Sequence, residues 1–448
     1  MSGWRTLPAM IPRSRVQNFP PLAIDGGPPT IVEPLPGPLL GVTEIGDAEI
    51  AAVTRVLRRT TMFRFVNDPS ISEAAQLEAR YRELCGVPYA LAIGGGGTGA
   101  LICALVGLGI GSGDEVIVPG YTYIATAAAC LVVGAIPVLA EIDASLTIDP
   151  ADVESKITPH TRAVIPVHMR GTTCDMDAVM DVARRRGLLV LEDCAQANGG
   201  RYRGRAVGAI GHAGAFSLQH YKIITAGEGG MVTTRDERVY RRAAIRHDSA
   251  MQFWRDGEDW ESFAGENFRM SELHAALGLA QFDRLEGILD RCRAVKKQLR
   301  AMTSGLSRIR QQPLPCADGD CGIAFAFFLD RPVDARRFSE ALTAEGVPNA
   351  TIYNKLIPDR HIYCAWDYVM EKRTSDPTGW PWTAARREIA YHPEMLPRTL
   401  DILGRCIAIG ISQHWTDRHV ELVASAIHKV HDRLWTRDET GIGTIQTG

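Results

Sequence analysis

The chain has 448 residues, of which 46% are hydrophobic and 23% charged, with a formal net charge of -3 at pH 7. This composition predicts a globular enzyme of two or three lobes and provides no positive field for nucleic acid or anionic lipid. No apolar run approaches the roughly 18 residues of a membrane span, and the N-terminus lacks the apolar core of a signal peptide, so we expect a cytoplasmic protein.

The chain begins with a segment that has no regular pattern. Residues 1–42 are rich in Pro and Gly. That composition predicts an irregular arm laid over the surface or over a neighbouring subunit, with a loose tail as the alternative. Helical periodicity follows at residues 44–59 and 72–85.

Short apolar strands then alternate with helices. The predicted strands are residues 89–93, 115–119, 136–141, 162–168 and 188–192, and predicted helices include 125–133 and 175–186. Strands that are apolar throughout, with helices between them, predict a mostly parallel sheet covered on both faces. Ligands of such sheets bind at the carboxyl ends of the strands.

The second half of the chain predicts a further, smaller lobe. We expect a strand after Gly230, one long helix from about residue 270 to 300, a strand at 322–329, a helix at 334–345, and a closing helix capped by Thr416 or Asp417. The predicted organisation is an arm (1–42), a large domain (43–300) and a small C-terminal α/β domain (301–448).

A glycine-rich loop opens the first helix after a predicted strand. The run GGGGTGAL, residues 94–101, can present backbone N–H groups at a helix N-terminus to an anion. It is neither a Walker loop nor a GxGxxG fingerprint with its acidic partner. Its spacing favours phosphate binding over a bare turn, with the ligand unspecified.

An aspartate and a lysine follow two later strands. Asp193, after an apolar strand, could cap a helix or hold a protonated ring nitrogen such as that of pyridoxal 5′-phosphate (PLP). Lys222 lies five residues after Ser217 and just before a glycine-rich turn. In isolation it would be an ordinary surface lysine. A phosphate loop, then Asp193, then Ser217 and Lys222, in this order, is much more specific, and predicts a lysine that holds a carbonyl compound covalently.

The ten cysteines do not form a disulfide framework in a chain of this length. Cys316 and Cys321 lie close together, but no second Cys or His pair completes a zinc site. We interpret the cysteines as structural and expect no metal.

Several ordered runs together carry a family resemblance. They include GIGSGDEVIVPGYTYIAT, LEDCAQANGGRYRGRAVGAIGHAGAFS, KIITAGEGGMVTT and ENFRMSELHAALGLAQFDRL. Through them, residues from about 40 to 300 closely resemble the StrS/DegT-like family of sugar aminotransferases. The resemblance implies an α/β fold of the fold type I PLP-dependent transferases: a mixed, mostly parallel seven-stranded sheet sandwiched by helices, with a smaller C-terminal α/β domain.

The same resemblance implies roles for individual residues. Lys222 would form the Schiff base with PLP, Asp193 would pair with the pyridine nitrogen, and Gln196 would contact the ring or its hydroxyl. Tyr123 would stack on the ring. The implied phosphate ligands are Gly97, Thr98 and Ser217, joined by Asn267 or Arg269 from the second subunit of a homodimer with shared active sites. His168 is left outside the predicted site.

Two departures from the family pattern bear on the substrate. His220 and Tyr221 stand before the lysine, where the family has small or polar residues, and could contact substrate or be packing residues. The segment 351–388 is also atypical. Its possible substrate contacts are Tyr353, Lys355, Arg360 and His361.

These observations predict a PLP-dependent aminotransferase. Glutamate or glutamine would convert PLP to pyridoxamine 5′-phosphate (PMP), and the amino group would pass to the keto group of a sugar nucleotide or cyclitol, in sugar or antibiotic biosynthesis. The rivals are a PLP enzyme of elimination, cyclisation or dehydration on the same fold, and a non-catalytic binding protein. Retention of Lys222, Asp193 and Ser217 together argues against the last.

Overall fold

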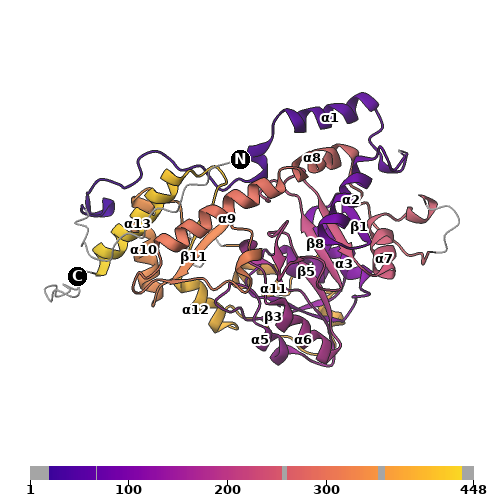
Figure 1. Cartoon of the computed structure of the whole chain (residues 1–448). Coiled ribbons are helices and arrows are strands. Elements are labelled where there is room, and N and C mark those ends of the chain that lie inside the picture. The colour runs from indigo at the N-terminus through magenta and orange to yellow at the C-terminus, as the bar shows by residue number, and fades with distance from the viewer. Residues whose placement is uncertain (1–19, 67, 255–259, 352–358, 436–448) are drawn as a thin grey trace.

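The computed structural model describes residues 20–66, 68–254, 260–351 and 359–435. Two sheets lie on either side of a long helix, α9 (Leu285–Met302), as Figure 1 shows. The larger sheet positions the candidate site.

The larger sheet has seven strands in the order β1-β9-β8-β5-β4-β2-β3. Neighbouring strands along the sheet from β8 through β5, β4 and β2 to β3 are parallel. In contrast, β9 runs antiparallel to both of its neighbours, β1 and β8. Their bounds are β1 (Tyr89–Ile93), β2 (Glu115–Pro119), β3 (Ile136–Ala140), β4 (Thr161–Val164), β5 (Leu189–Asp193), β8 (Ala213–Ser217) and β9 (Gly230–Thr234). The predicted mixed, mostly parallel seven-stranded sheet is confirmed.

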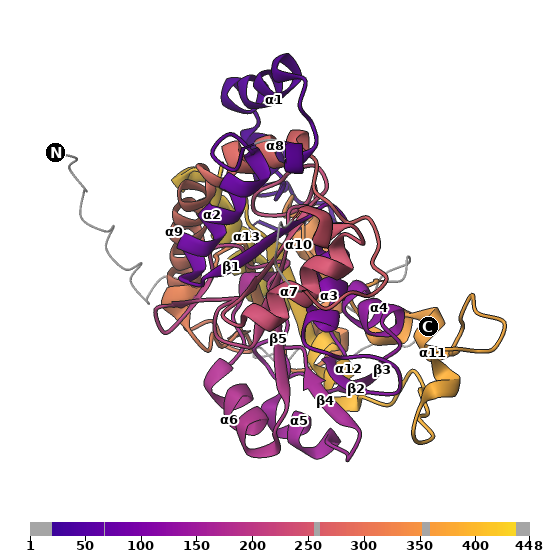
Figure 2. The same cartoon turned by 90° about the vertical axis from the view of Figure 1, so that its right-hand side faces the viewer.

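Helices cover both faces of this sheet because its strands are apolar on both sides. Alternate residues of one strand enter different cores: Leu91 and Ile93 pack with one set of helices, while Ala90 and Ala92 pack with the other. The first set is α3 (Gly96–Gly107), α4 (Ala125–Val132) and α7 (Glu237–His247). The second is α2 (Glu73–Cys85), α5 (Pro150–Lys156), α6 (Met176–Arg186), α8 (Glu272–Phe282) and α9. Figure 2 shows α5 and α6 side by side below the sheet.

Two predicted elements differ from the structure. The single long helix expected from residue 270 to 300 is divided into α8 and α9, because Asp283 and Arg284 hydrogen-bond three residues back instead of four. Arg284 there forms an ion pair with Glu49 at 3.1 Å. The strand expected over 162–168 is shorter, and only an isolated bridge between Val167 and Asp193 continues it.

The C-terminal region builds the smaller sheet. Its antiparallel order is β10-β11-β13-β12, with bounds β10 (Arg310–Gln311), β11 (Ala324–Phe328), β12 (Ala350–Thr351) and β13 (Cys406–Gly410). The associated helices are α10 (Pro332–Ala344), α11 (Asp367–Met370), α12 (Pro397–Arg405) and α13 (Asp417–Trp435). A two-stranded hairpin, β6 (Arg201–Tyr202) and β7 (Arg205–Ala206), is separate from both sheets. The predicted domain boundaries at residues 42 and 300 stay predictions.

The described part of the N-terminal arm lies over the C-terminal lobe of its own chain (Figure 1). The buried Glu345 carboxylate accepts hydrogen bonds from the backbone N–H of Ala23 and Thr30, at 2.8 and 2.9 Å. Lys429 Nζ completes this buried cluster at 2.8 Å from Glu345. After the arm, α1 (Asp47–Arg59) packs on α8 at the edge of the molecule.

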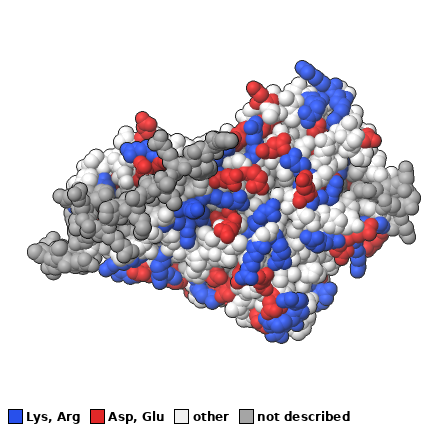
Figure 3. Space-filling model, in the orientation of Figure 1, with Lys and Arg blue, Asp and Glu red and all other residues white. Residues whose placement is uncertain are grey.

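The charge distribution agrees with the small net charge. On the face in Figure 3, basic and acidic side chains are interspersed. Among the helices of the described residues, none is long and apolar enough to span a membrane.

Candidate active site

The residues predicted to form the site follow the carboxyl ends of strands of the large sheet. The glycine loop follows β1, Tyr123 follows β2, Asp193 ends β5, and Ser217 ends β8. Parallel strands bring these ends to the same edge.

The glycine loop and Ser217 approach each other closely. A Cβ atom added to Gly97 would lie 2.9 Å from Ser217 Cβ, so this position requires glycine. Gly96, at the start of α3, has a φ of +66°, which glycine adopts without strain. The first turn of α3, which includes Thr98, therefore presents its N–H groups beside the Ser217 hydroxyl. This cradle suits a phosphate.

Asp193 is a buried carboxylate held by two donors. It is 4% exposed, and its Oδ2 accepts a hydrogen bond from Thr126 Oγ1 at 2.8 Å, while Oδ1 accepts one from the N–H of Ala195 at 3.0 Å. Burial raises the pKa of Asp193; the two hydrogen bonds and the positive charge of Lys222 oppose that rise. A cationic ligand group beside this carboxylate would compensate its burial.

Lys222 extends from the turn after β8 toward the same region. Burial lowers its pKa, against the opposing charges of Asp193 and Glu228. Within the residues that the structure describes, no hydrogen bond or ion pair engages its Nζ atom. Its backbone is fixed, since Lys222 N–H donates to the carbonyl of Gln219 at 2.9 Å. The amine is therefore available for chemistry.

Gln196 lies three residues after Asp193, in the segment that follows β5. Its Oε1 atom accepts a hydrogen bond from the backbone N–H of Arg170 at 2.9 Å. The amide oxygen is thus occupied, which leaves the NH₂ group for a ligand.

Tyr123 meets a segment of the C-terminal lobe at the edge of the site. The N–H groups of Thr122 and Ile124 donate to the carbonyls of His361 and Arg360, at 2.9 and 3.0 Å. The Tyr123 and His361 rings are 5.4 Å apart. Asp359 Oδ1 lies 2.8 Å from His361 Nδ1. The structure therefore brings two of the possible substrate contacts, Arg360 and His361, to the site edge.

The other two, Tyr353 and Lys355, lie outside the described residues.

Arg269 and Asn267, the two candidates for a phosphate ligand across a dimer interface, differ in their partners within this chain. Arg269 Nη1 donates to the buried Asp248 at 2.7 Å. Asn267 is exposed, and its Oδ1 atom accepts a hydrogen bond from the N–H of Arg269, at 3.3 Å. Both lie near the glycine loop, because Ile93 and Arg269 form a β-bridge.

His220 and Tyr221 are not core residues of this chain. Both are exposed, Tyr221 to 68%, and their rings meet edge to face with centroids 4.9 Å apart. The packing interpretation therefore fails within the single chain. A contact with substrate or with another molecule stays open.

The structure reveals two polar partners that the sequence did not indicate. Thr126 at the start of α4 binds Asp193, and Arg170 after β4 binds Gln196. Thr126 had one usable signal, its place in the first turn of the helix that follows β2. Arg170 had none, because its partners are distant in sequence.

His168, Glu192 and Cys194 form a buried cluster behind the site. Glu192 accepts hydrogen bonds from the N–H groups of Gly208, Ile210 and Gly211. His168 Nδ1 accepts the N–H of Cys174 at 3.1 Å, so Nε2 carries the proton and donates to Glu192, also at 3.1 Å. These bonds engage the lone pairs that a metal would need, and the cluster supports the end of β5.

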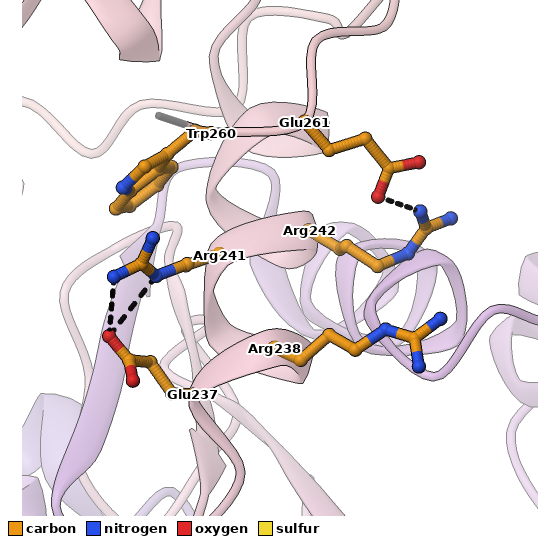
Figure 4. Close-up of a pocket in the computed structure, with 6 residues that line it drawn as sticks. All are labelled: Glu237, Arg238, Arg241, Arg242, Trp260 and Glu261. Carbon is orange, nitrogen blue, oxygen red and sulfur yellow. Dashed lines mark hydrogen bonds and ion pairs between the residues drawn. The ribbon is translucent and has the colours of Figure 1, made fainter. Parts of the chain in front are cut away.

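A surface cavity of about 210 Å³ lies elsewhere, along α7, and is lined by Glu237, Arg238, Arg241, Arg242, Trp260 and Glu261 (Figure 4). Arg242 Nε also donates to the carbonyl of Val106, near the C-terminal end of α3. The glycine loop opens the other end of that helix. At about 1.5 Å per residue, roughly 15 Å separate the two places, so the cavity is distinct from the candidate site.

Known proteins resemble this chain in both sequence and fold. A model of the DegT/DnrJ/EryC1/StrS aminotransferase family matches residues 44–378. GDP-perosamine synthase of Caulobacter vibrioides is 45% identical over 212 residues, which cover 47% of this chain and 56% of that protein. L-glutamine:scyllo-inosose aminotransferase of Streptomyces griseus is 38% identical over 286 residues, which cover 60% and 66%.

These two alignments span less than two thirds of either relative. The fold comparison extends further. An aminotransferase from Psychrobacter cryohalolentis superimposes with a TM-score of 0.71 at 28% identity, over 88% of this chain and 98% of that one.

Proposed function

This chain belongs to the DegT/DnrJ/EryC1/StrS aminotransferase family, and from this premise we propose that it is a PLP-dependent aminotransferase. It moves the amino group of glutamate or glutamine to the keto group of a sugar nucleotide or cyclitol. The convergence of Lys222, Asp193 and the cradle of Gly97 and Ser217 at one sheet edge carries the proposal. The names of the relatives, which include a glutamine-dependent inosose aminotransferase, support the choice of donor and acceptor.

The residues present fit PLP. The cradle that a Cβ on Gly97 would fill suits its phosphate, and the buried Asp193 suits its protonated ring nitrogen. Bound PLP supplies a carbonyl carbon for the lysine and a ring that withdraws electrons from the carbon that loses its proton. Because a protonated ring nitrogen compensates the charge of Asp193, it also lowers the raised pKa of that carboxylate.

The remaining chemistry belongs to the protein's own residues. Lys222 Nζ holds or moves the proton at the reacting carbon of the substrate. The lowered pKa of Lys222 increases the share of neutral amine near pH 7, which a base needs. Thr126 orients Asp193. The Tyr123 ring, beside His361 at the site edge, provides an aromatic face for stacking.

We also propose a homodimer in which Asn267 reaches the partner's phosphate site. Asn267 is exposed, whereas the alternative Arg269 is paired with Asp248. Large apolar side chains, Ile50 and Leu57, are exposed one heptad apart on α1, which packs on α8 shortly after Asn267. Such an exposed apolar stripe is typical of a surface that another subunit covers.

The dimer has its own test. Leu57→Asp is expected to yield monomers in sedimentation experiments, and Asn267→Ala is expected to lower PLP affinity about tenfold while the dimer persists, through loss of one hydrogen bond to a charged group. A monomeric wild-type protein with full activity would contradict this arrangement.

The decisive experiment for the reaction uses the PLP-loaded protein with single donors. L-glutamine or L-glutamate is expected to change the visible spectrum of the bound cofactor and to release the corresponding oxo acid. A keto cyclitol and a nucleotide-linked keto sugar are then compared as acceptors by mass spectrometry of the product. Absence of a spectral change with all common donors would favour elimination, cyclisation or dehydration instead.

A further inference from the structure

Arg170 occupies a strained turn at the edge of the site. It lies in a short helical turn (Met169–Gly171) after β4 and has a left-handed backbone, with φ 52° and ψ 33°. This conformation is unfavourable for a non-glycine residue, so it persists only where the surroundings impose it. The residues from His168 to Thr172, here called the arginine turn, are fixed at both ends.

The fixation comes from both lobes. On one side, the N–H of His168 donates to the carbonyl of Asp193 at 3.0 Å. On the other, the N–H of Cys321 donates to the carbonyl of Gly171 at 3.0 Å, and a Cβ on Gly171 would lie 2.8 Å from Cys321 Cβ. The chain therefore has little freedom to move the Arg170 side chain away from the site.

The guanidinium group of Arg170 has donors to spare. Its Nε atom donates to Tyr121 Oη at 2.7 Å. That phenol is neutral near pH 7, because burial raises the pKa of Tyr121 to about 12. No carboxylate of the described residues forms an ion pair with Arg170, and the nearby Asp359 binds His361 at 2.8 Å. A half-buried guanidinium with unused N–H groups is a binding site for an oxyanion, which it can hold with two parallel hydrogen bonds.

The position of the turn indicates which oxyanion it binds. The backbone N–H of Arg170 contacts Gln196, the residue expected at the cofactor ring. A carboxylate attached directly to the reacting carbon comes within reach of such a side chain. The phosphates of a nucleotide sugar are several bonds from the keto carbon, and a cyclitol carries no oxyanion.

We propose that Arg170 binds the α-carboxylate of the amino donor. This inference rests on the proposed aminotransferase function and deepens it, because it assigns donor recognition to one residue. Glutamine and glutamate share the α-carboxylate, so Arg170 serves both equally.

The test compares Arg170→Gln and Arg170→Lys with the wild type and with Arg336→Gln, which removes an exposed arginine of α10. In the donor half-reaction, Arg170→Gln is expected to raise the apparent Kd for both glutamine and glutamate about 10- to 100-fold, with a much smaller change in the maximal rate. Arg170→Lys should retain part of the affinity, and Arg336→Gln should match the wild type.

Two ligands isolate the carboxylate itself. The amine 4-aminobutanamide is glutamine without its α-carboxylate, and its apparent Kd should be the same in wild type and Arg170→Gln. Glutaramate keeps the carboxylate but has no amine and cannot react, so calorimetry reports its binding without turnover. We expect glutaramate to bind the wild-type holoenzyme and to lose that binding in Arg170→Gln.

The outcomes separate this inference from the proposed function. If no donor reacts with the wild type, the aminotransferase proposal fails. If donors react equally well with wild type and Arg170→Gln, or if the variant changes only the KM of the acceptor, the assignment of Arg170 is overturned while the aminotransferase remains. Cofactor content and circular dichroism show whether Arg170→Lys keeps the fold. If Arg170→Gln misfolds, the apparent Kd of the donors for the folded Arg170→Lys decides the question.

Discussion

Two turns at the same edge of the large sheet carry the basic groups of the site. The first, here called the lysine turn, comprises residues 217–222, begins at the last residue of β8, and holds Ser217 and Lys222 only five residues apart. The second is the arginine turn after β4, whose contacts are Tyr121, Gln196 and Cys321. A short spacing defines the lysine turn, whereas contacts among segments far apart in the chain define the arginine turn.

The difference shows which kind of chemistry can be recognised from the sequence of a chain. The proposed covalent attachment uses a lysine that lies in close succession with a hydroxyl and a tight turn in this chain, and this produces a local motif. Recognition of a substrate carboxylate needs only one guanidinium in the right place, which any of several turns could supply. The predictions below test this contrast, from the largest expected effect to the smallest.

The lysine turn should lose its function when the Lys222 amine is removed. Lys222→Ala is expected to lose the visible absorbance of the lysine-bound cofactor and to lower turnover by roughly 10⁴-fold or more, because it removes both the covalent attachment and the proton carrier. Absorbance spectra and steady-state rates measure this. An unchanged cofactor spectrum would contradict the role of Lys222.

The arginine turn depends on a buried ion pair beneath it, and breaking that pair should destabilise the fold. Asp320 forms a buried ion pair with Lys296 at 2.8 Å and accepts a hydrogen bond from Thr172 at 2.8 Å. Asp320→Ala leaves the lysine charge buried and unpaired, so unfolding in urea should show a loss of about 3–5 kcal/mol. Asp330→Ala breaks an exposed pair with Arg310 and should cost at most about 1 kcal/mol. Equal effects would refute the buried support.

Asp193 lies between the two turns. Asp193→Asn should lower turnover about 10²-fold through loss of a buried charge pair with the cofactor ring.

In the cofactor-free protein, the same substitution should increase stability relative to the wild type as pH rises. Because burial raises the pKa of Asp193, the wild type binds more protons folded than unfolded, and it loses stability as pH rises from about 4 through the raised pKa. The Asn variant lacks this loss, so its melting temperature relative to the wild type should increase between pH 4 and pH 8. A constant difference would show that Asp193 is not buried as described.

The outer edge of the lysine turn should tolerate change. Tyr221→Thr restores a small polar residue at a position that is 68% exposed, so the free energy of unfolding should change by no more than about 0.5 kcal/mol. The KM values for donor and acceptor then show whether Tyr221 contacts either substrate. A loss above about 1 kcal/mol would indicate packing against another molecule.

Much of the fold was predictable because its signals are local. The strand at Tyr89–Ile93 and the strand at Glu115–Pro119 have the predicted bounds. The C-terminal helix begins at Asp417, after Thr416, one of its two predicted caps. The division between α8 and α9 was missed, because the residues at the break keep nearly helical backbone angles and Arg284 pairs with Glu49, far away in the chain.

The sequence by itself determined the large sheet, the order of the chemical groups along it, and the family. Apolar strands, glycine at the helix entry, and the spacing of Ser217 from Lys222 are properties of short segments, so they are readable without a structure. Only the tertiary structure decided that Thr126 holds Asp193 and that Arg360 and His361 meet the segment around Tyr123 that follows β2. It also decided that Arg170, among the described residues, keeps unused donors beside Gln196. These contacts join segments that are tens to hundreds of residues apart, and side-chain hydrogen bonds over such separations leave no periodic trace in the chain.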